Sequence, residues 1–240
     1  MQKQGDSYAL VVLDLAGLVV NYANAVYAGI TGAFRAHGLS MDRETASFAL
    51  GHSPDQAIAA VFRQTGLTEP LDEAGFQRLS QSYRKELKRF FQFSPALAPM
   101  PGALRTMARM RSEGLRVGMC SDLDCTVMEL VLQRLGWTDA GHVDAMVCSD
   151  SGLSETKAGL IAQLMVECGQ RDGERTVYVG VTPGDLAAGR QVNCAKVLAV
   201  DVGVAAFQAG DWSEADGVME FVDELPSLLG LSSSTPWMER

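Results

Sequence analysis

Asp14 is the residue best placed to do chemistry, because it interrupts an apolar stretch. The residues before it, 9–13, are all apolar, and the stretch resumes after it. A carboxylate in such surroundings loses hydration, which costs free energy unless it is hydrogen-bonded or binds a cation. Gly17 allows the chain to turn sharply three residues later. We therefore interpret Asp14 as a functional residue and Gly17 as part of a substrate-binding loop.

Polar residues also follow three later apolar stretches. They are Ser121 and Asp122, then Ser149 and Asp150, then 182–185, which end with Asp185. The carboxyl ends of parallel strands meet at one edge of a sheet, where ligands bind, so these residues are candidates for one site. Asp and Ser side chains also cap helices. Capping is our first prediction for Asp122 and Ser149, and Asp122 is in addition a candidate for contacting substrate.

Apolar stretches and helical periodicity alternate along most of the chain. Five stretches are short and almost wholly apolar, which is typical of strands buried on both faces of a parallel sheet. They cover 9–13, 115–120, 143–148, 176–180 and 196–200. Helical spacing of apolar residues fills 103–111, 125–135 and 158–168. This alternation predicts an α/β fold with a doubly wound, Rossmann-like parallel sheet.

The segment between the first two predicted strands is too long for a single connection. It spans about a hundred residues, whereas connections in such folds are short. Its periodicity predicts helices over 24–37, 54–66 and 72–93, and a proline-rich stretch, 95–101, marks the return. We predict a helical domain at 21–95 inserted into a core formed by 1–20 and 96–240.

The predicted elements carry a set of short motifs. They are Leu13-Asp14-Leu15-Ala16-Gly17, Pro101-Gly102-Ala103, Gly114-Leu115-Arg116-Val117, Leu135-Gly136-Trp137, Val147-Cys148-Ser149-Asp150, Val179-Gly180 and Asp185-Leu186-Ala187-Ala188-Gly189. Together they resemble the haloacid dehalogenase-like (HAD) superfamily, with the helical insert in the place of its C1-type cap. The closest likeness is to the phosphonoacetaldehyde hydrolase (phosphonatase)-like branch, which has alanine where most HAD phosphatases have a second aspartate.

The resemblance implies roles for individual residues. Asp14 would be the nucleophile that takes a phosphoryl group as an aspartyl phosphate, and Ser121 would hydrogen-bond the phosphoryl oxygens. Asp14, the backbone carbonyl of Ala16 and Asp185 would hold Mg²⁺. A carboxylate that attacks a phosphoryl dianion needs such a cation to remove the repulsion.

Three residues differ from the family's motifs at positions that have catalytic or metal-binding roles. Leu18 stands at a threonine position and lacks the hydroxyl that orients the phosphoryl group. Val181 stands where the family has an acidic metal ligand, which puts Mg²⁺ in question. Ala16 stands where ordinary HAD phosphatases place a general acid, and losing a general acid costs about 10²–10⁴ in rate.

Two further departures concern cationic positions. Glu155 stands where the family has a lysine or arginine, and Lys157 is displaced from that position by two residues. Pro54 stands at the position of the Schiff-base lysine of phosphonoacetaldehyde hydrolase. Without that lysine no imine can form, so the resemblance does not extend to phosphonoacetaldehyde hydrolysis.

Lys157 and His52 each have two interpretations. Lys157 can supply the missing cation, because its side chain is long and flexible, or it can be a solvated residue of a first helical turn. His52 can be the general acid if the cap closes over the site, since an unperturbed histidine titrates near pH ~6.5. Otherwise it is a polar residue of an exposed loop.

The amino-acid composition limits the classes of molecule that the protein is expected to bind. The 240 residues carry a net charge of −9, from 20 Lys and Arg against 29 Asp and Glu, so neither nucleic acid nor a membrane surface is an expected partner. The apolar stretch 8–20 is too short to span a bilayer and no basic segment precedes it. A small anionic substrate would need a local positive site. The resemblance also makes a homodimer through a helix at 22–36 possible.

The cysteines predict the redox state of the protein. The five cysteines include no CxxC pair and are odd in number, which favours reduced, mostly buried thiols in a cytoplasmic protein. We expect no disulfide at the end of the second predicted strand, where Cys120 and Cys125 lie.

Three functions remain open. The favoured one is a divergent HAD-like hydrolase that acts on a small phosphorylated metabolite through Asp14, Ser121, Asp185 and Lys157. A catalytically inactive binding protein is the alternative; the departures favour it, and the retained carboxylate of Asp14 opposes it. The third is a Mg²⁺-independent hydrolase resembling the dehalogenase branch, in which Asp14 would attack carbon.

Overall fold

One parallel sheet forms the centre of the molecule. The computed structural model describes residues 8–21, 23–65, 72–137, 141–151, 154, 156–201 and 212–231. Within them, six parallel strands follow the order β3-β2-β1-β4-β5-β6. The strands are β1 (Leu10–Asp14), β2 (Arg116–Ser121), β3 (Ala145–Cys148), β4 (Thr176–Gly180), β5 (Lys196–Val200) and β6 (Gly217–Met219). The predicted α/β fold with a doubly wound sheet is confirmed.

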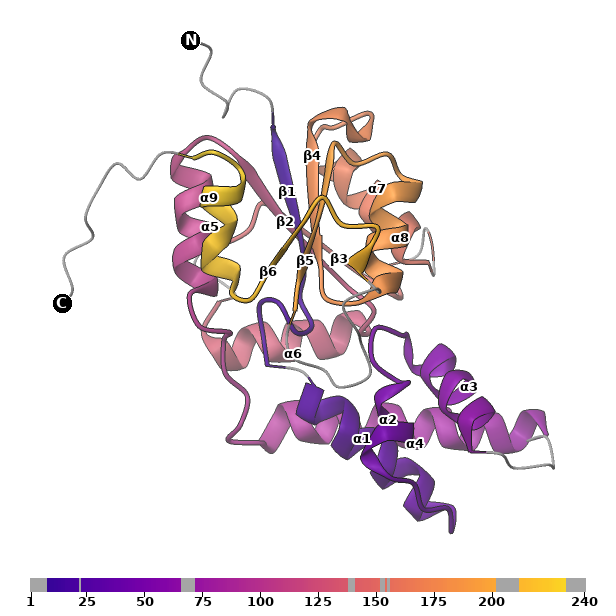
Figure 1. Ribbon diagram of the computed structural model, residues 1–240. Helices are drawn as coiled ribbons and strands as arrows, with labels where there is room; N and C mark the ends of the chain where they lie inside the picture. The colour runs from indigo at the N-terminus through magenta and orange to yellow at the C-terminus, as the bar shows by residue number, and fades with distance from the viewer. Residues whose placement is uncertain are drawn as a thin grey trace.

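Helices cover both faces of this sheet (Figure 1). They are α5 (Ala103–Ser112), α6 (Cys125–Leu135), α7 (Lys157–Glu167), α8 (Pro183–Gln191) and α9 (Leu225–Leu228). Leu10 and Val12 of β1 share a hydrophobic cluster with α7 and α8, whereas Val11 and Leu13 share one with α5, α6 and α9. Since successive strand residues point to opposite faces, a sheet covered on both sides needs strands that are apolar throughout.

The short elements β6 and α9 lie outside the predicted elements. β6 has three residues and pairs only with β5 at the sheet edge, and α9 has four residues. Segments of this length show no periodicity that distinguishes them from loops.

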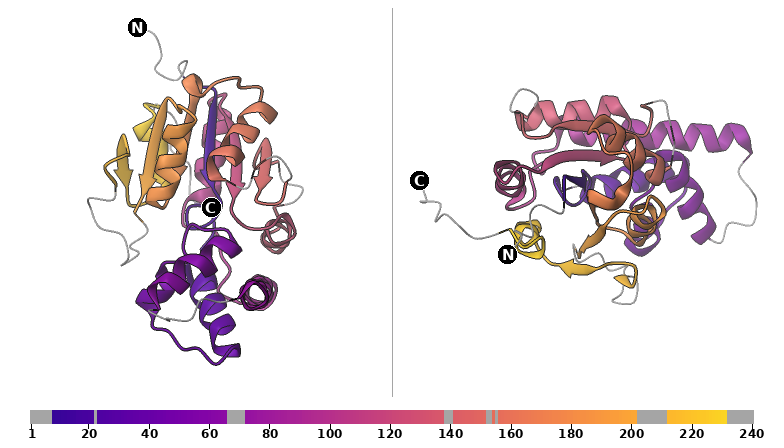
Figure 2. Two further views of the ribbon diagram at one scale, coloured as in Figure 1. Left: turned by 90° about the vertical axis from the view of Figure 1, so that its right-hand side faces the viewer. Right: turned by 90° about the horizontal axis from the view of Figure 1, so that it is seen from above.

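Four helices of the first half of the chain form an insert beyond the carboxyl ends of the strands (Figure 1). They are α1 (Ala23–Ala36), α2 (Arg43–Ser47), α3 (Pro54–Gln64) and α4 (Glu73–Phe93). Helices α1 and α4 approach closely at Gly29, where a Cβ would lie 2.9 Å from the Tyr83 ring. Helix α4 also packs against α6, so that the insert lies against the core (Figure 2). Of the four helices, only α2 was outside the predicted elements.

The two chain segments that join the insert to the core run side by side. Met100 N donates to Val19 O at 2.8 Å, and Asn21 N donates to Ala98 O at 3.1 Å. Val20 and Pro99 form an isolated antiparallel bridge. The chain therefore leaves and re-enters the core at one place. The returning segment lies within the proline-rich stretch that was predicted to mark the return. The limits 21 and 95 remain a prediction.

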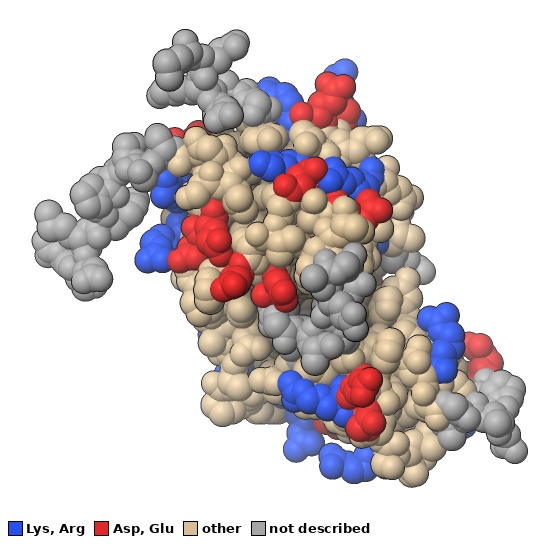
Figure 3. Space-filling model, in the orientation of Figure 1, with Lys and Arg blue, Asp and Glu red and all other residues tan. Residues whose placement is uncertain are grey.

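Charged side chains of both signs are interspersed on the face shown in Figure 3. Arg190 pairs with Asp216 at 2.7 Å, and Arg105 pairs with Asp223 at 3.1 Å. Of the helices that the structure describes, none combines the length and the apolarity needed to cross a membrane.

Candidate active site

Three carboxylates converge on one lysine at the carboxyl edge of the sheet. Asp14 ends β1, Asp122 follows β2, and Asp185 lies in the first turn of α8. The Lys157 Nζ atom lies 3.0 Å from Asp14 Oδ1, 2.5 Å from Asp122 Oδ2 and 3.4 Å from Asp185 Oδ1. Its side chain is only 10% exposed. The interpretation of Lys157 as a solvated residue is therefore wrong, and its role as the missing cation stays a prediction.

Lys157 reaches this position from the first residue of α7. Thr156 caps that helix by accepting a hydrogen bond from Gly159 N at 3.2 Å. A lysine in a first helical turn is electrostatically unfavourable, because free N–H groups point toward it. The three carboxylates offset this penalty. Glu155, which stands at the family's cationic position, lies outside the described residues.

The cluster of Lys157 and the three carboxyl groups is buried, and it contains one basic group for three acidic groups. Asp14 is 2% exposed. Burial raises its pKa to about 8, with Lys157 lowering it and Asp185 and Asp122 raising it further. Burial likewise raises the pKa of Asp122, against the effect of Lys157. Burial alone would lower the pKa of Lys157, but the three carboxylates hold it well above its usual value. One ammonium therefore faces up to three negative charges.

Asp185 is held rigidly by hydrogen bonds. Its Oδ2 accepts from Val181 N at 3.0 Å and from Thr182 N at 2.9 Å, and Thr182 Oγ1 accepts from Asp185 N at 3.1 Å. The Tyr178 hydroxyl donates to its Oδ1 at 3.3 Å. Burial raises the pKa of Tyr178 well above its usual value, so this hydroxyl stays a donor. Asp185 therefore caps α8 and faces Lys157 at the same time.

Tyr178 was not among the site residues predicted from the sequence. The only signal that could have found it is a phenol in the middle of an otherwise apolar strand, since a buried hydroxyl needs a partner.

The predicted capping roles of Asp122 and Ser149 are wrong. Helix α6 begins after Asp124, and Asp122 turns instead toward Lys157. Ser149 begins no helix; its hydroxyl lies 3.4 Å from Asp124 Oδ1. Ser121 is fully buried at the end of β2, where its Oγ accepts from Leu123 N at 3.1 Å. The structure thus brings Ser121 and Asp122 to the edge that carries Asp14.

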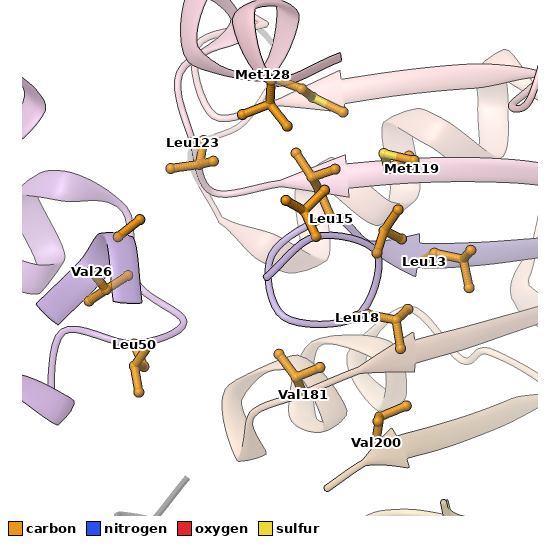
Figure 4. Packing of buried hydrophobic residues seen from close by; sticks show 14 of the residues in the cluster. Leu13, Leu15, Leu18, Val26, Leu50, Met119, Leu123, Met128, Val181 and Val200 are labelled. Carbon is orange, nitrogen blue, oxygen red and sulfur yellow. The ribbon is translucent and has the colours of Figure 1, made fainter. Parts of the chain in front are cut away.

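The loop after β1 packs against apolar side chains. Gly17 has φ +89°, and a Cβ there would lie 3.2 Å from Val181 Cγ2. Val181 and Leu18 therefore pack beside the loop that carries the Ala16 carbonyl, within the same hydrophobic cluster (Figure 4). Leu18 is 1% exposed, so a threonine there would place a hydroxyl among apolar neighbours.

His52 approaches the site from the insert. Gly51, with φ +71°, lies so close to the start of α8 that a Cβ would be 2.6 Å from Thr182 Cγ2. The side chain of His52 is half-buried rather than exposed. Burial lowers its pKa, whereas Asp122 and Asp185 raise it and Arg63 lowers it. His52 is therefore within electrostatic reach of the carboxylates.

A disulfide joins Cys125 to Cys148, contrary to the prediction of reduced thiols. The loops after the neighbouring strands β2 and β3 bring the two Cα atoms to 5.2 Å, a distance that a disulfide spans. A separation of 23 residues gives no sign of this proximity in the sequence. The other cysteines, Cys120, Cys168 and Cys194, are buried thiols, as predicted.

Oxygen donors of the kind that Mg²⁺ prefers lie at the end of β1 and after β4. These donors are the carboxylate of Asp14, the carbonyl of Ala16 and the carboxylate of Asp185. Proteins usually bind Mg²⁺ through one or two carboxylates, with water and substrate phosphate completing the shell. When the carboxyl groups around Lys157 are ionised, a divalent cation would balance their excess of negative charge. Val181 contributes methyl groups and no ligand, so the site has one acidic group fewer than the family pattern implies.

Two sequence comparisons match this chain to known hydrolases. The family model described as haloacid dehalogenase-like hydrolase matches residues 8–193. Phosphonoacetaldehyde hydrolase of Bordetella pertussis is 26% identical over 192 residues, which cover 75% of this chain and 68% of the relative.

Solved structures share the fold. A phosphonoacetaldehyde hydrolase-like protein from Oleispira antarctica superposes with a TM-score of 0.79 at 13% identity, covering 96% of each chain. CbbY from Rhodobacter sphaeroides in complex with phosphate superposes with a TM-score of 0.74 at 16% identity, covering 93% of this chain and 99% of that one. The resemblance found in the short motifs is thereby confirmed.

Proposed function

Because the chain belongs to the haloacid dehalogenase-like hydrolases, we propose that it hydrolyses a small phosphorylated metabolite through a phosphoenzyme on Asp14. The observation that carries the proposal is the buried ion pair between Asp14 and Lys157. It places an oxygen nucleophile beside a fixed cation, and a phosphoryl group needs both in order to approach a carboxylate.

The proposed reaction has two steps. An oxygen of Asp14 attacks phosphorus, the bond from phosphorus to the leaving oxygen breaks, and Asp14 becomes an aspartyl phosphate. Water then attacks phosphorus, which releases inorganic phosphate and restores the carboxylate. The ammonium of Lys157 and the hydroxyl of Ser121 bind the phosphoryl oxygens, and Asp122 orients Lys157 from 2.5 Å away.

His52 is the proposed proton donor to the leaving alcohol. Burial works against this role because it favours neutral imidazole, whereas Asp122 and Asp185 favour the protonated form. A bound phosphoryl dianion adds to the second effect. Unchanged turnover in His52→Ala would end this assignment and leave substrates that need no proton, such as acyl phosphates.

Mg²⁺ is part of the proposal, held by Asp14, the Ala16 carbonyl and Asp185. When bound, it would neutralise the repulsion between the phosphoryl group and the carboxylates. The insert, 21–95, is the proposed cap, and its contact at Gly51 shields the site from water.

Phosphonoacetaldehyde is not the proposed substrate. Pro54, the first residue of α3, stands where the family likeness calls for a Schiff-base lysine, and it offers no amine. An imine cannot form at that position.

Calorimetry tests the proposal. We expect saturable Mg²⁺ binding by the wild-type protein, its loss in Asp14→Asn, and tighter binding in Val181→Asp, which adds a carboxylate beside Gly17. Glu129→Gln, which removes an exposed carboxylate of α6, is the matched control and should bind as the wild type does.

Turnover is then measured on a panel of phosphate esters and acyl phosphates. A single turnover in ¹⁸O-water shows which atom water attacks: attack at phosphorus puts the label in phosphate, whereas attack at the carbonyl of an ester on Asp14 puts it in the protein. Absence of Mg²⁺ binding at millimolar concentration, together with no turnover on the panel, would overturn the proposal.

Val181 favours a second candidate, a Mg²⁺-independent hydrolase in which Asp14 attacks carbon. This enzyme would form an ester on Asp14, detectable as a mass adduct, and subsequent water attack would put ¹⁸O into the protein. A protein that shows neither metal binding nor any adduct is the inactive binding protein.

A further inference from the structure

The loops that follow β2 and β3 are joined covalently beside the candidate active site. Cys125, the first residue of α6, is bonded to Cys148, the last residue of β3. None of the chemistry proposed for Asp14 uses this disulfide.

Hydrogen bonds connect the same two loops. Ser149 N donates to Leu123 O at 3.2 Å, and Cys125 N donates to Asp150 Oδ1 at 2.6 Å. The Ser149 hydroxyl lies 3.4 Å from Asp124 Oδ1. The disulfide therefore closes a network that holds residues 121–125 against residues 148–150.

This network adjoins two ion pairs on which the site depends. Asp122, three residues before Cys125, binds Lys157. Asp124, one residue before it, lies 3.4 Å from Nε of Arg84 in α4. One short loop thus carries a carboxylate of the active site, a contact to the insert and a sulfur atom of the disulfide.

The two residues of the disulfide differ in exposure. Cys125 is half-buried, whereas the free cysteines Cys120, Cys168 and Cys194 are buried. Cys125 is the first residue of an 11-residue helix, whose N-terminal N–H groups favour a thiolate there, whereas the neighbouring carboxylate of Asp150 opposes it. Exchange begins at a sulfur that an external thiolate can reach, and Cys125 is the more exposed residue of the bonded pair.

We propose that Cys125 and Cys148 are a reversible thiol–disulfide modification site, which exchanges with glutathione-type thiols and fixes the active-site loop 121–125 when oxidised. In reduction, one external thiolate attacks Cys125 Sγ, the bond to Cys148 Sγ breaks, and Cys148 leaves as a thiolate that takes up a proton. A second external thiol then resolves the mixed disulfide. The two protein sulfurs are reduced, and two external thiols become one external disulfide.

Reduction frees the loop without removing any catalytic group. Asp122 and Asp124 remain, but the covalent tie between their loop and β3 is gone. We expect the backbone of the two loops to open more often, while the sheet stays closed.

A redox titration tests the exchange. The full-length native protein is equilibrated in buffers of graded reduced-to-oxidised glutathione ratio, quenched with acid, alkylated and analysed by mass spectrometry. A chelator is included, because the sulfur atoms of Cys125 and Cys148 and a carboxylate oxygen of Asp150 lie within 4.8 Å of one another and could bind adventitious metal.

We expect Cys125 and Cys148 to pass together from dithiol to disulfide across the series. Cys194→Ser, which removes a buried thiol elsewhere, should leave the transition unchanged. A pair that stays oxidised until the protein unfolds would overturn the proposal, and so would a pair that stays reduced in the most oxidising buffer.

Hydrogen exchange tests the consequence for the loop. In the reduced protein, amides of Leu123, Cys125 and Ser149 should exchange about tenfold faster, whereas those of β5 should not change. The double variant Cys125→Ser/Cys148→Ser should show the reduced pattern in every buffer. Equal rates in the two redox states would overturn the effect on the loop. Neither readout requires turnover, so this proposal can fail or succeed separately from the proposed function.

Discussion

One lysine shared by three carboxylates dominates the site at the scale of single residues. Lys157 lies within 3.4 Å of an oxygen of Asp14, Asp122 and Asp185. Removing one member of such a buried group leaves the others unbalanced, so these side chains act as a unit. The unit has fixed geometry because backbone N–H groups and the Tyr178 hydroxyl orient Asp185.

Asp14→Asn should make metal-free protein more stable at neutral pH. The pKa of Asp14 rises from 3.8 to about 8 on folding, so between these values the native state holds more protons than the unfolded state. Stability must then fall as pH rises through this window. An asparagine has no such dependence, so the advantage of the variant should grow from pH 4 to pH 8.

Urea denaturation in chelator measures this difference, which should increase steadily between pH 4 and pH 8. The same variant should lose turnover. A stability difference that does not change with pH would contradict the assignment of a raised pKa to Asp14.

At the scale of elements, the loop between α2 and α3 closes onto the start of α8. Gly51 makes this approach possible because it has positive φ and no Cβ. The arrangement brings the loop that carries His52 to the start of α8.

Gly51→Ala should push the loop away from Thr182 and lower kcat/KM about tenfold, since a displaced proton donor loses its geometry. Gly38→Ala is the matched control. Gly38 also has positive φ, +78°, but a Cβ there would meet nothing within 4 Å. Both variants carry the backbone strain, and only Gly51→Ala should change kcat/KM on a substrate from the panel; equal effects would show that the contact is irrelevant.

Arg84 connects three elements. Its guanidinium lies 2.9 Å from Asp55 of α3 and 3.4 Å from Asp124, the residue before α6. Hydrogen bonding to Arg84 lowers the pKa of Asp55, so this contribution is present above the ordinary carboxylate pKa and is lost as pH falls through the lowered value.

Arg84→Met should therefore lower the free energy of unfolding by about 1 kcal/mol at pH 7, a modest amount because both side chains are partly exposed. The loss should shrink in acid. Arg89→Met, in the same helix and mostly exposed, should have little effect. Urea denaturation of both variants at pH 7 and in acid is the measurement; equal losses in the two would contradict a connecting role for Arg84.

At the scale of the whole molecule, an acidic protein holds a buried ammonium group in its candidate site. The net charge is −9, whereas the site offers the ammonium of Lys157 to an incoming anion. The negative electrostatic potential of the surface therefore opposes the approach of an anionic substrate, and positive charge within the site must compensate for this repulsion.

Salt should then raise kcat/KM for an anionic substrate. Screening weakens the repulsion between like charges, so about a twofold increase is expected on going from low to physiological ionic strength. A neutral ester hydrolysed by the same site is the control and should show no such rise. A fall with salt would mean that local attraction by Lys157 outweighs the overall charge.

The sequence by itself determined the architecture. Buried parallel strands must be apolar on both faces, so five of the six strands of the sheet were visible as apolar stretches. Asp14 was visible because a carboxylate next to such a stretch is costly, and the insert because its length exceeds any single connection. Each of these features can be recognised from the residues of one continuous segment of the chain.

The tertiary structure alone decided what these residues contact. Lys157 and Asp14 are 143 positions apart, and only the packing of α7 on the sheet shows that the lysine points at the carboxylate. Asp122 was assigned to a helix cap because a single segment does not reveal the competing partner across the site. Cys125 and Cys148 bond because two neighbouring strands end at the same edge. Contacts of this kind depend on strand order and register, which bring distant segments together and leave no periodic trace in the sequence.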